Sequence, residues 1–183
     1  MFKKELTTHF LLTFIYFTII SLFNFHLGFS LLFLWLGALL GTFLLDFDHV
    51  LVAFDKENKT WWAEKFRFLW QRKKYKEAIF HLAESHLEHS HLVFHSALFQ
   101  PVLLFLAFFI LTSTGSLLGN GLVMSVNLHL LKDEWHSFLE KGNIDFLFWQ
   151  IKKKIDRDSQ RVYLIVASFF FFLISLLLVW ISS

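Results

Sequence analysis

Histidine and aspartate residues recur at three places in the chain with the spacing of metal ligands. The candidate ligands are Asp46, Asp48, His49, His91, His95, His129 and Asp133. Two pairs in this set, one ending at His95 and one starting at His129, are four residues apart, a spacing that places both members on one helical face. Neutral imidazole and carboxylate oxygen suit zinc, and also manganese or iron. The pattern therefore predicts a divalent metal site, with zinc as the first expectation.

Asp48 is the candidate catalytic residue of this set. On a regular helix Asp46 and His49 share a face, whereas Asp48 turns away. If the helix continues through this segment, Asp48 is a spare carboxylate that can act as a general base. If the helix ends there, Asp46 and Asp48 can both bind metal. One ion with a carboxylate base and a two-metal site are equally compatible with the sequence.

The surroundings of Asp46 and Asp48 strengthen the metal prediction. Both lie in an apolar run, where insertion of an aspartate at mid-helix costs about 3 kcal/mol and less towards the end. Such a carboxylate is expected to face a cavity, a partner or a metal. The histidines interpreted only as polar residues of the headgroup layer are His9, His26 and His86.

The composition is that of a membrane protein. Hydrophobic residues make up 56% of the 183 residues and charged residues only 17%, against about a quarter in soluble domains. The absence of cysteine excludes disulfides and thiolate metal sites. A formal net charge of +2 gives no reason to expect nucleic-acid binding, and the chain has no glycine-rich phosphate loop.

Five apolar segments are long enough, or nearly so, for a membrane span of about 20 residues. They cover about 9–29, 30–54, 94–112, 117–131 and 162–181. The sequence therefore predicts an all-α, polytopic helical membrane protein with one membrane-embedded domain over 1–183. Within the spans we expect Pro101 to bend the third. We expect the glycines to be close-packing positions, namely Gly37, Gly41, Gly115, Gly119 and Gly121.

Lysine and arginine predict the orientation. All 17 lie in three segments: Lys3 with Lys4, eight between Lys56 and Lys76, and seven between Lys132 and Arg161. Basic loops face the cytoplasm, so five spans with a cytoplasmic N-terminus place all three inside. The localisation predicted is the plasma (inner) membrane. Aromatic and basic residues alternate in 55–93 and 132–161, as in helices that lie in the headgroup layer.

This topology brings the three groups of candidate ligands together. The cytoplasmic ends of the second, third and fourth spans carry Asp46 to His49, His95, and His129 with Asp133, respectively. Three helix ends thus place imidazoles and carboxylates at one membrane depth. A site at that depth is within reach of lipid headgroups.

At these residues the chain resembles the YdjM-type family of membrane-bound, predicted metal-dependent hydrolases. Residues 41–49, GTFLLDFDH, resemble the family's G-x-x-x-P-D-x-D-H signature; His95-Ser96 resembles the end of its H-R-G-x-x-H-S motif, and 129–133 its H-x-x-x-D motif. Leu45 replaces the family's proline. Ser90 stands where the first histidine of the second motif is expected, so His89 or His91 would substitute for it.

The resemblance implies a hydrolase distantly related to zinc-dependent phospholipase C. Together with the interfacial site, it predicts hydrolysis of a lipid or lipid-linked phosphoester, with membrane lipid as the surrounding partner. Two alternatives stay open. One is a non-catalytic membrane protein whose metal clamps three helices, as a subunit of a larger assembly. The other is a haem protein with histidine axial ligands, which would show a Soret band.

Overall fold

The structure, a computed structural model, describes residues 2–85, 92–151 and 154–182, and every regular element in these ranges is a helix. In chain order the elements are α1 (Phe2–Phe23), η1 (Phe25–Ser30), α2 (Leu31–Leu44), α3 (Phe47–Phe54), α4 (Trp61–Gln71), α5 (Tyr75–Glu84), α6 (Phe99–Ser113), α7 (Leu117–Lys141), η3 (Asp145–Phe148) and α8 (Arg157–Ser182). The all-α prediction is confirmed.

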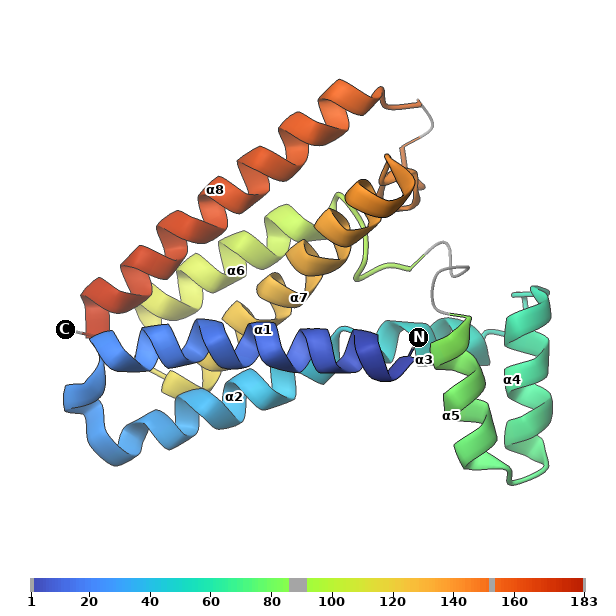
Figure 1. The fold of residues 1–183 in the computed structure, drawn as a ribbon, viewed down its shortest axis with the longest axis horizontal. Coiled ribbons are helices and arrows are strands. Elements are labelled where there is room, and N and C mark those ends of the chain that lie inside the picture. The colour runs from blue at the N-terminus through green and yellow to red at the C-terminus, as the bar shows by residue number, and fades with distance from the viewer. Residues whose placement is uncertain (1, 86–91, 152–153, 183) are drawn as a thin grey trace.

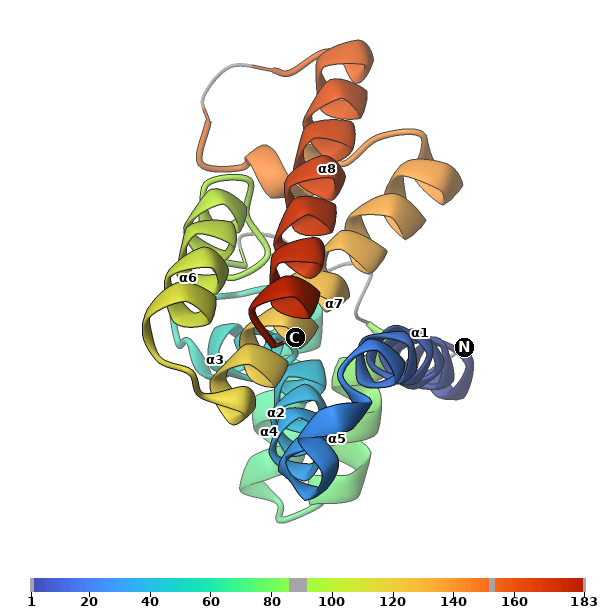
Figure 2. The ribbon, with the colours of Figure 1, turned by 90° about the vertical axis from the view of Figure 1, so that its left-hand side faces the viewer.

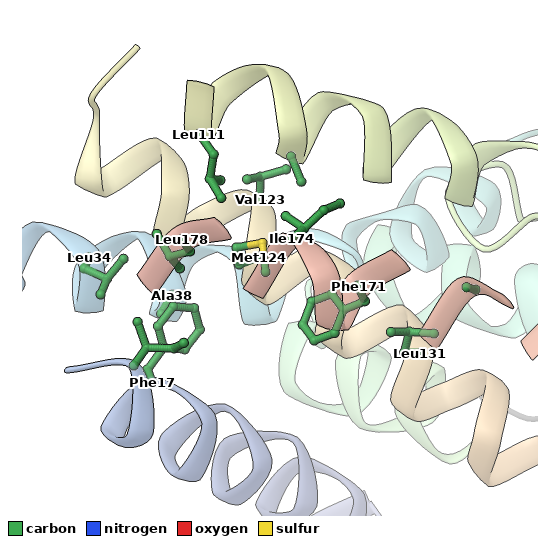
Figure 3. Packing of buried hydrophobic residues seen from close by; sticks show 13 residues of the cluster. Phe17, Leu34, Ala38, Leu111, Val123, Met124, Leu131, Phe171, Ile174 and Leu178 are labelled. Carbon is green, nitrogen blue, oxygen red and sulfur yellow. The ribbon is translucent and has the colours of Figure 1, made fainter. Parts of the chain in front are cut away.

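Helix α7 lies at the centre of a bundle and contacts α1, α2, α6 and α8 (Figures 1 and 2). The largest cluster of buried apolar residues lies between these helices, with Phe17 from α1, Met124 from α7 and Phe171 from α8 among its members (Figure 3). Since α7 has neighbours on all sides, its polar residues are buried as well as its apolar ones, including Asn127, His129 and Asp133.

The closest helix contact joins α2 to α7 through glycine. A Cβ added at Gly37 would overlap the backbone carbonyl of Leu118, and one at Gly121 would overlap that of Leu34. Gly41 meets the Leu122 carbonyl in the same way. The packing role predicted for these three glycines is confirmed. Gly115, however, lies in the turn before α7 with a φ of +60° and has open space beside it, and Gly119 faces only side chains.

The second predicted span is interrupted where its aspartates lie. Helix α2 ends at Leu44 and α3 begins at Phe47, and the junction is closed by bonds from the Asp48 amide to the Leu45 carbonyl and from the His49 amide to the Asp46 carbonyl. These bonds join residues three apart, the tighter pattern of a 3-10 turn. The helix is thus interrupted although position 45 is leucine and not the proline of the YdjM-type motif that this segment resembles.

Two predictions about the third span are wrong. The helix begins at Phe99 and not at residue 94, and residues 92–98 form bends and a turn. His95 therefore lies on no helical face, and its predicted helical partner His91 lies outside the described residues. Pro101 lies in the first turn of α6, where the missing amide of proline is tolerated, and not in mid-helix. The fourth predicted span is also longer than expected, because α7 continues to Lys141.

Two helical segments are long and apolar enough to cross a membrane, Phe25–Phe54 and Arg157–Ile181. Thr7–Phe23 and Phe99–Ser113 are apolar but shorter. The outer surfaces of α1, α2, α6 and α8 carry large apolar side chains that are more than half exposed, such as Phe14, Leu32, Phe105 and Phe172. Soluble monomers rarely expose contiguous apolar surface on this scale, so the surface is suited to contact with lipid.

Helices α4 and α5 form a hairpin beside α3 at one end of the bundle (Figure 1). Its own apolar core includes Trp62, Phe66 and Leu82, and packs against Ala53 of α3. Arg67 fixes the entry to α4, since its guanidinium donates to the carbonyls of Ala53, Asp55 and Asn58. The predicted interfacial segment 55–93 is therefore helical over 61–71 and 75–84.

Candidate metal centre

His129 and Asp133 form the middle of the site. They are one turn apart on α7, and His129 Nε2 lies 3.1 Å from Asp133 Oδ2. Both residues are buried, at 3% and 6% exposure. The pairing predicted from their spacing is confirmed.

The interruption of α2 determines how the His129 ring is held. Thr42 lies in the last turn of α2, where backbone carbonyls lack intrahelical partners, and its carbonyl oxygen is 2.7 Å from His129 Nδ1. A carbonyl only accepts, so Nδ1 donates and carries the proton of the neutral ring. Nε2 then keeps its lone pair and points towards Asp133, the arrangement found in metal-binding histidines.

His95 approaches the same carboxylate from the segment between α5 and α6. Its Nε2 is 3.8 Å from Asp133 Oδ2, and its Nδ1 is 3.6 Å from Asp48 Oδ2. Both distances exceed that of a hydrogen bond. Asp48 is itself fixed by the Phe94 amide, which donates to Oδ2 at 2.7 Å. Asp48 thus lies beside Nδ1 of the His95 ring, the nitrogen that faces away from Asp133.

Asp46 is the accessible carboxylate of the site. Its Oδ1 lies 3.5 Å from His129 Nε2, and its side chain is 42% exposed, whereas that of Asp48 is 3% exposed. Because the helix is interrupted, the two carboxylates contact different histidines. The sequence alternative for an interrupted helix was that Asp46 and Asp48 both bind metal; in the structure Asp46 lies beside His129 Nε2, and Asp48 lies at the far nitrogen of the His95 ring.

The remaining predicted ligands are His49 and His91. His49 is buried at 4% exposure, and its ring centroid is 5.0 Å from that of His95. His91, and the neighbouring His89, lie outside the described residues. His136, which continues the spacing after Asp133, is 3.4 Å from Glu140 and 40% exposed, so it lies apart from the cluster.

Sequence reasoning missed His9 and Lys132. His9, interpreted as a headgroup residue, is buried and lies 3.2 Å from Asp133 Oδ1. The Lys132 ammonium is 2.8 Å from His9 Nε2 and 3.0 Å from Asp133 Oδ1. The signal for Lys132 was its position directly before a predicted ligand. The signal for His9 was its position at the cytoplasmic end of the first predicted span, the membrane depth predicted for the other ligands.

His9, His129 and Asp133 each offer one ligand atom, all within 4.8 Å of one another, so this group could hold a metal ion. Within the described ranges, no hydrogen bond reaches either ring nitrogen of His95, His129 Nε2 or Asp133 Oδ2. Buried polar atoms of this kind normally have partners. Ligand atoms that share a tetrahedral zinc lie roughly 3.3–3.6 Å apart, close to the 3.1–3.8 Å separations found here.

The buried carboxylate of Asp133 has four potential partners. Three imidazoles and the Lys132 ammonium lie within 4 Å of its two oxygens. The neighbouring Glu134 is fully buried and points elsewhere, because its carboxyl group accepts a hydrogen bond from Gln100 at 2.8 Å.

Comparison of the chain with protein-family models, with curated proteins and with solved structures gives no match. The resemblance to the YdjM-type family rests on three short motifs and stays a prediction. The structure itself shows helices as the regular elements of the described residues, two segments long and apolar enough to cross a membrane, and a buried group of imidazoles and carboxylates that could hold a metal ion.

Proposed function

We propose that this chain is a membrane-embedded, metal-dependent hydrolase that cleaves a lipid or lipid-linked phosphoester at the cytoplasmic face of the plasma membrane. The observation that carries the proposal is the approach of His95, from the segment before α6, to His129 and Asp133 of α7, with buried nitrogen and oxygen atoms that make no hydrogen bond within the described residues. Three convergent ligands with an adjacent carboxylate are the donor set of a catalytic zinc site.

Each residue has a defined role in this proposal. His95 Nε2, His129 Nε2 and Asp133 Oδ2 hold the ion, for which zinc is the first candidate and manganese or iron are alternatives. Asp48 lies 3.6 Å from the opposite ring nitrogen of His95, and its charge favours the ring orientation that turns Nε2 towards the ion, in the position of the carboxylates behind metal-binding histidines. Asp46, which is accessible and 3.5 Å from His129, takes the base role that the sequence assigned to Asp48.

The proposed chemistry is hydrolysis of a phosphoester. A divalent ion held by His95, His129 and Asp133 would act as a Lewis acid towards a phosphoryl oxygen and would lower the pKa of water to near neutral. Asp46 accepts a proton from the attacking water as the water oxygen forms the new P–O bond. It returns that proton to the ester oxygen as the old P–O bond breaks, so that the leaving group departs as an alcohol. Asp133, His95 and His129 keep their geometry throughout, because burial fixes their side chains.

The arrangement of the elements supports a lipid substrate and a five-span topology. The charge-free α1–α2 and α6–α7 connections and the C-terminus lie at one end of the bundle, and the N-terminus and the basic α4–α5 hairpin at the other (Figure 1). The metal group lies towards the basic end, at the start of α1 and the second half of α7. A headgroup could reach it while acyl chains contact the apolar surfaces of α2 and α6.

Metal content and activity test this proposal together. Purified protein in lipid nanodiscs is expected to hold metal and to release a soluble headgroup from a panel of phospholipids and lipid phosphates. A chelator should abolish release, and zinc or manganese should restore it. If His129→Ala retains both metal and activity, the proposal is wrong.

A second function is favoured by the depth of burial. His95, His129 and Asp133 are all at most 6% exposed, as in closed structural sites, and they link the 92–98 segment to α7. In a non-catalytic protein the ion would clamp these segments, and a larger assembly would supply the function. Metal removal would then lower the unfolding temperature while no lipid in the panel is hydrolysed.

A further inference from the structure

Lys132 places a positive charge inside the candidate metal group. Only 7% of its side chain is exposed, the same fraction as for Asp133. Lysine is almost never buried to this extent without a partner. Its ammonium lies 3.0 Å from Asp133 Oδ1, the oxygen opposite the one that faces His95 and His129.

The contact with His9 shows how this charge is accommodated. An ammonium donates and cannot accept, so at 2.8 Å it is His9 Nε2 that accepts from Lys132. A nitrogen whose lone pair accepts a proton cannot bind metal through the same lone pair. The His9 ring also lies against that of His129, with centroids 3.9 Å apart and the ring planes tilted by 36°.

The two carboxylate oxygens of Asp133 therefore face different groups. Its Oδ2 faces His129 and His95, where the proposed ion binds, and its Oδ1 faces Lys132 and His9. We infer that the Lys132 ammonium occupies the place that a second metal ion would take beside Asp133, so that the site holds one divalent ion and His9 serves Lys132 instead of the metal. This inference rests on the proposed metal site and fixes its stoichiometry.

Metal stoichiometry tests the inference without reference to activity. Wild-type protein, metal-saturated and then dialysed, is expected to hold one zinc or manganese per chain by elemental analysis. His9→Asn, which keeps an acceptor for Lys132, should also hold one. Lys132→Glu replaces the ammonium with a ligand and should hold two, and adding His9→Asn should return the count to one.

The control for charge is Lys141→Glu, on the exposed last turn of the same helix, which should leave the count at one. Lys132→Met should tighten binding of the remaining ion about tenfold or more, because a like charge has been removed from a low-dielectric site.

The inference is overturned if wild-type protein holds two ions, or if His9→Asn loses its ion. These results need only wild-type protein and the conservative variant, so they decide even if Lys132→Glu fails to fold. If both His129→Ala and His9→Asn lose the ion, this inference is rejected and the proposed function stands. If His129→Ala keeps the wild-type metal count, the proposed function itself is rejected.

Discussion

Asp133 is the residue on which the site depends, since four side chains lie within 4 Å of its two carboxylate oxygens. His129 comes from the same helix, whereas His9 and His95 come from distant parts of the chain. Because Asp133 is buried, any change that removes its partners leaves its carboxylate without compensation. Such changes cost several kcal/mol in other proteins, about 3–5 by mutation of one partner.

Replacing His129 with alanine is expected to empty the site. His129 is the only described histidine whose ring is fixed by a backbone carbonyl on one side and faces Asp133 on the other, so the Nε2 lone pair has no substitute. Elemental analysis should find less than a tenth of the wild-type metal. His136→Ala on the same helix is the matched control and should keep the full amount, because the His136 ring is 40% exposed and lies 3.4 Å from Glu140, apart from the cluster.

Asp48 and Asp46 should behave differently when each is changed to asparagine. Asp48→Asn is expected to weaken metal affinity by about 10- to 100-fold, the usual effect of losing a carboxylate behind a histidine ligand. Metal titration with a competing chelator measures this. An affinity equal to that of the wild type would mean that Asp48 does not orient His95.

Asp46→Asn is expected to leave metal content largely intact and to lower the turnover of lipid substrate by about 10²- to 10⁴-fold, the range for loss of a general base. Headgroup release by metal-replete protein measures it. If Asp46→Asn loses metal and Asp48→Asn loses turnover instead, the two roles must be exchanged, as the sequence first indicated for Asp48.

The sequence predicted the local part of this site and missed the distant part. The four-residue spacing of His129 and Asp133 sets their geometry directly, because both lie on one regular helix. Nothing local to His9 reveals that it meets Lys132, 123 residues further along the chain. The contact depends on how α1 packs against α7, which hydropathy does not specify.

At the scale of elements, the α2–α7 contact determines whether the site can form. Thr42 on α2 supplies the carbonyl that fixes the His129 ring on α7, and a further hydrogen bond joins the Thr42 and Ser125 hydroxyls at 3.0 Å. The two helices reach this separation because glycine lines the contact. Small residues are the usual means of close approach between helices in membranes.

Gly121→Ala is therefore expected to destabilise the protein, although alanine favours helix. The added Cβ would overlap the Leu34 carbonyl of α2, and relieving the overlap means moving the helices apart, at about 1–3 kcal/mol. Thermal unfolding in detergent should show a lower midpoint and weaker metal binding. Gly119→Ala, where the Cβ meets only the Ile110 and Ser116 side chains, should unfold at or above the wild-type temperature.

Element boundaries were the weaker part of the sequence prediction, for identifiable reasons. Hydropathy predicted a helix from residue 94, yet the chain turns through 92–98. There the Ala97 amide donates a hydrogen bond to the Leu147 carbonyl, and the Phe94 amide donates one to the Asp48 carboxylate. Both are tertiary contacts. Helix α7 continues past residue 131 because buried neighbours, and not lipid, surround its polar residues.

For the whole molecule, the arrangement of charge predicts which end of the bundle faces the cytoplasm. The basic hairpin, with Lys73 and Lys74 in its turn, and the charge-free turn at Thr114 lie at opposite ends (Figure 1). Positively charged loops stay on the cytoplasmic side. The chain contains no cysteine, so a single introduced cysteine reports its own position without background labelling.

Gln71→Cys and Thr114→Cys make the matched pair for this test, since both positions are exposed and lie outside the apolar cores. In intact cells of a bacterial host, stripped of any outer barrier, a membrane-impermeant thiol reagent should label Thr114→Cys and leave Gln71→Cys unreacted. After lysis both should react to the same extent. The physical reason is the cost of carrying the hairpin's lysines and arginines through hydrocarbon, about 2.5–3.5 kcal/mol for each at the centre of the bilayer.

Labelling of Gln71→Cys alone in intact cells would invert the orientation and put the metal group outside. Labelling of both before lysis would place the two ends on one side, and the five-span topology would have to be abandoned.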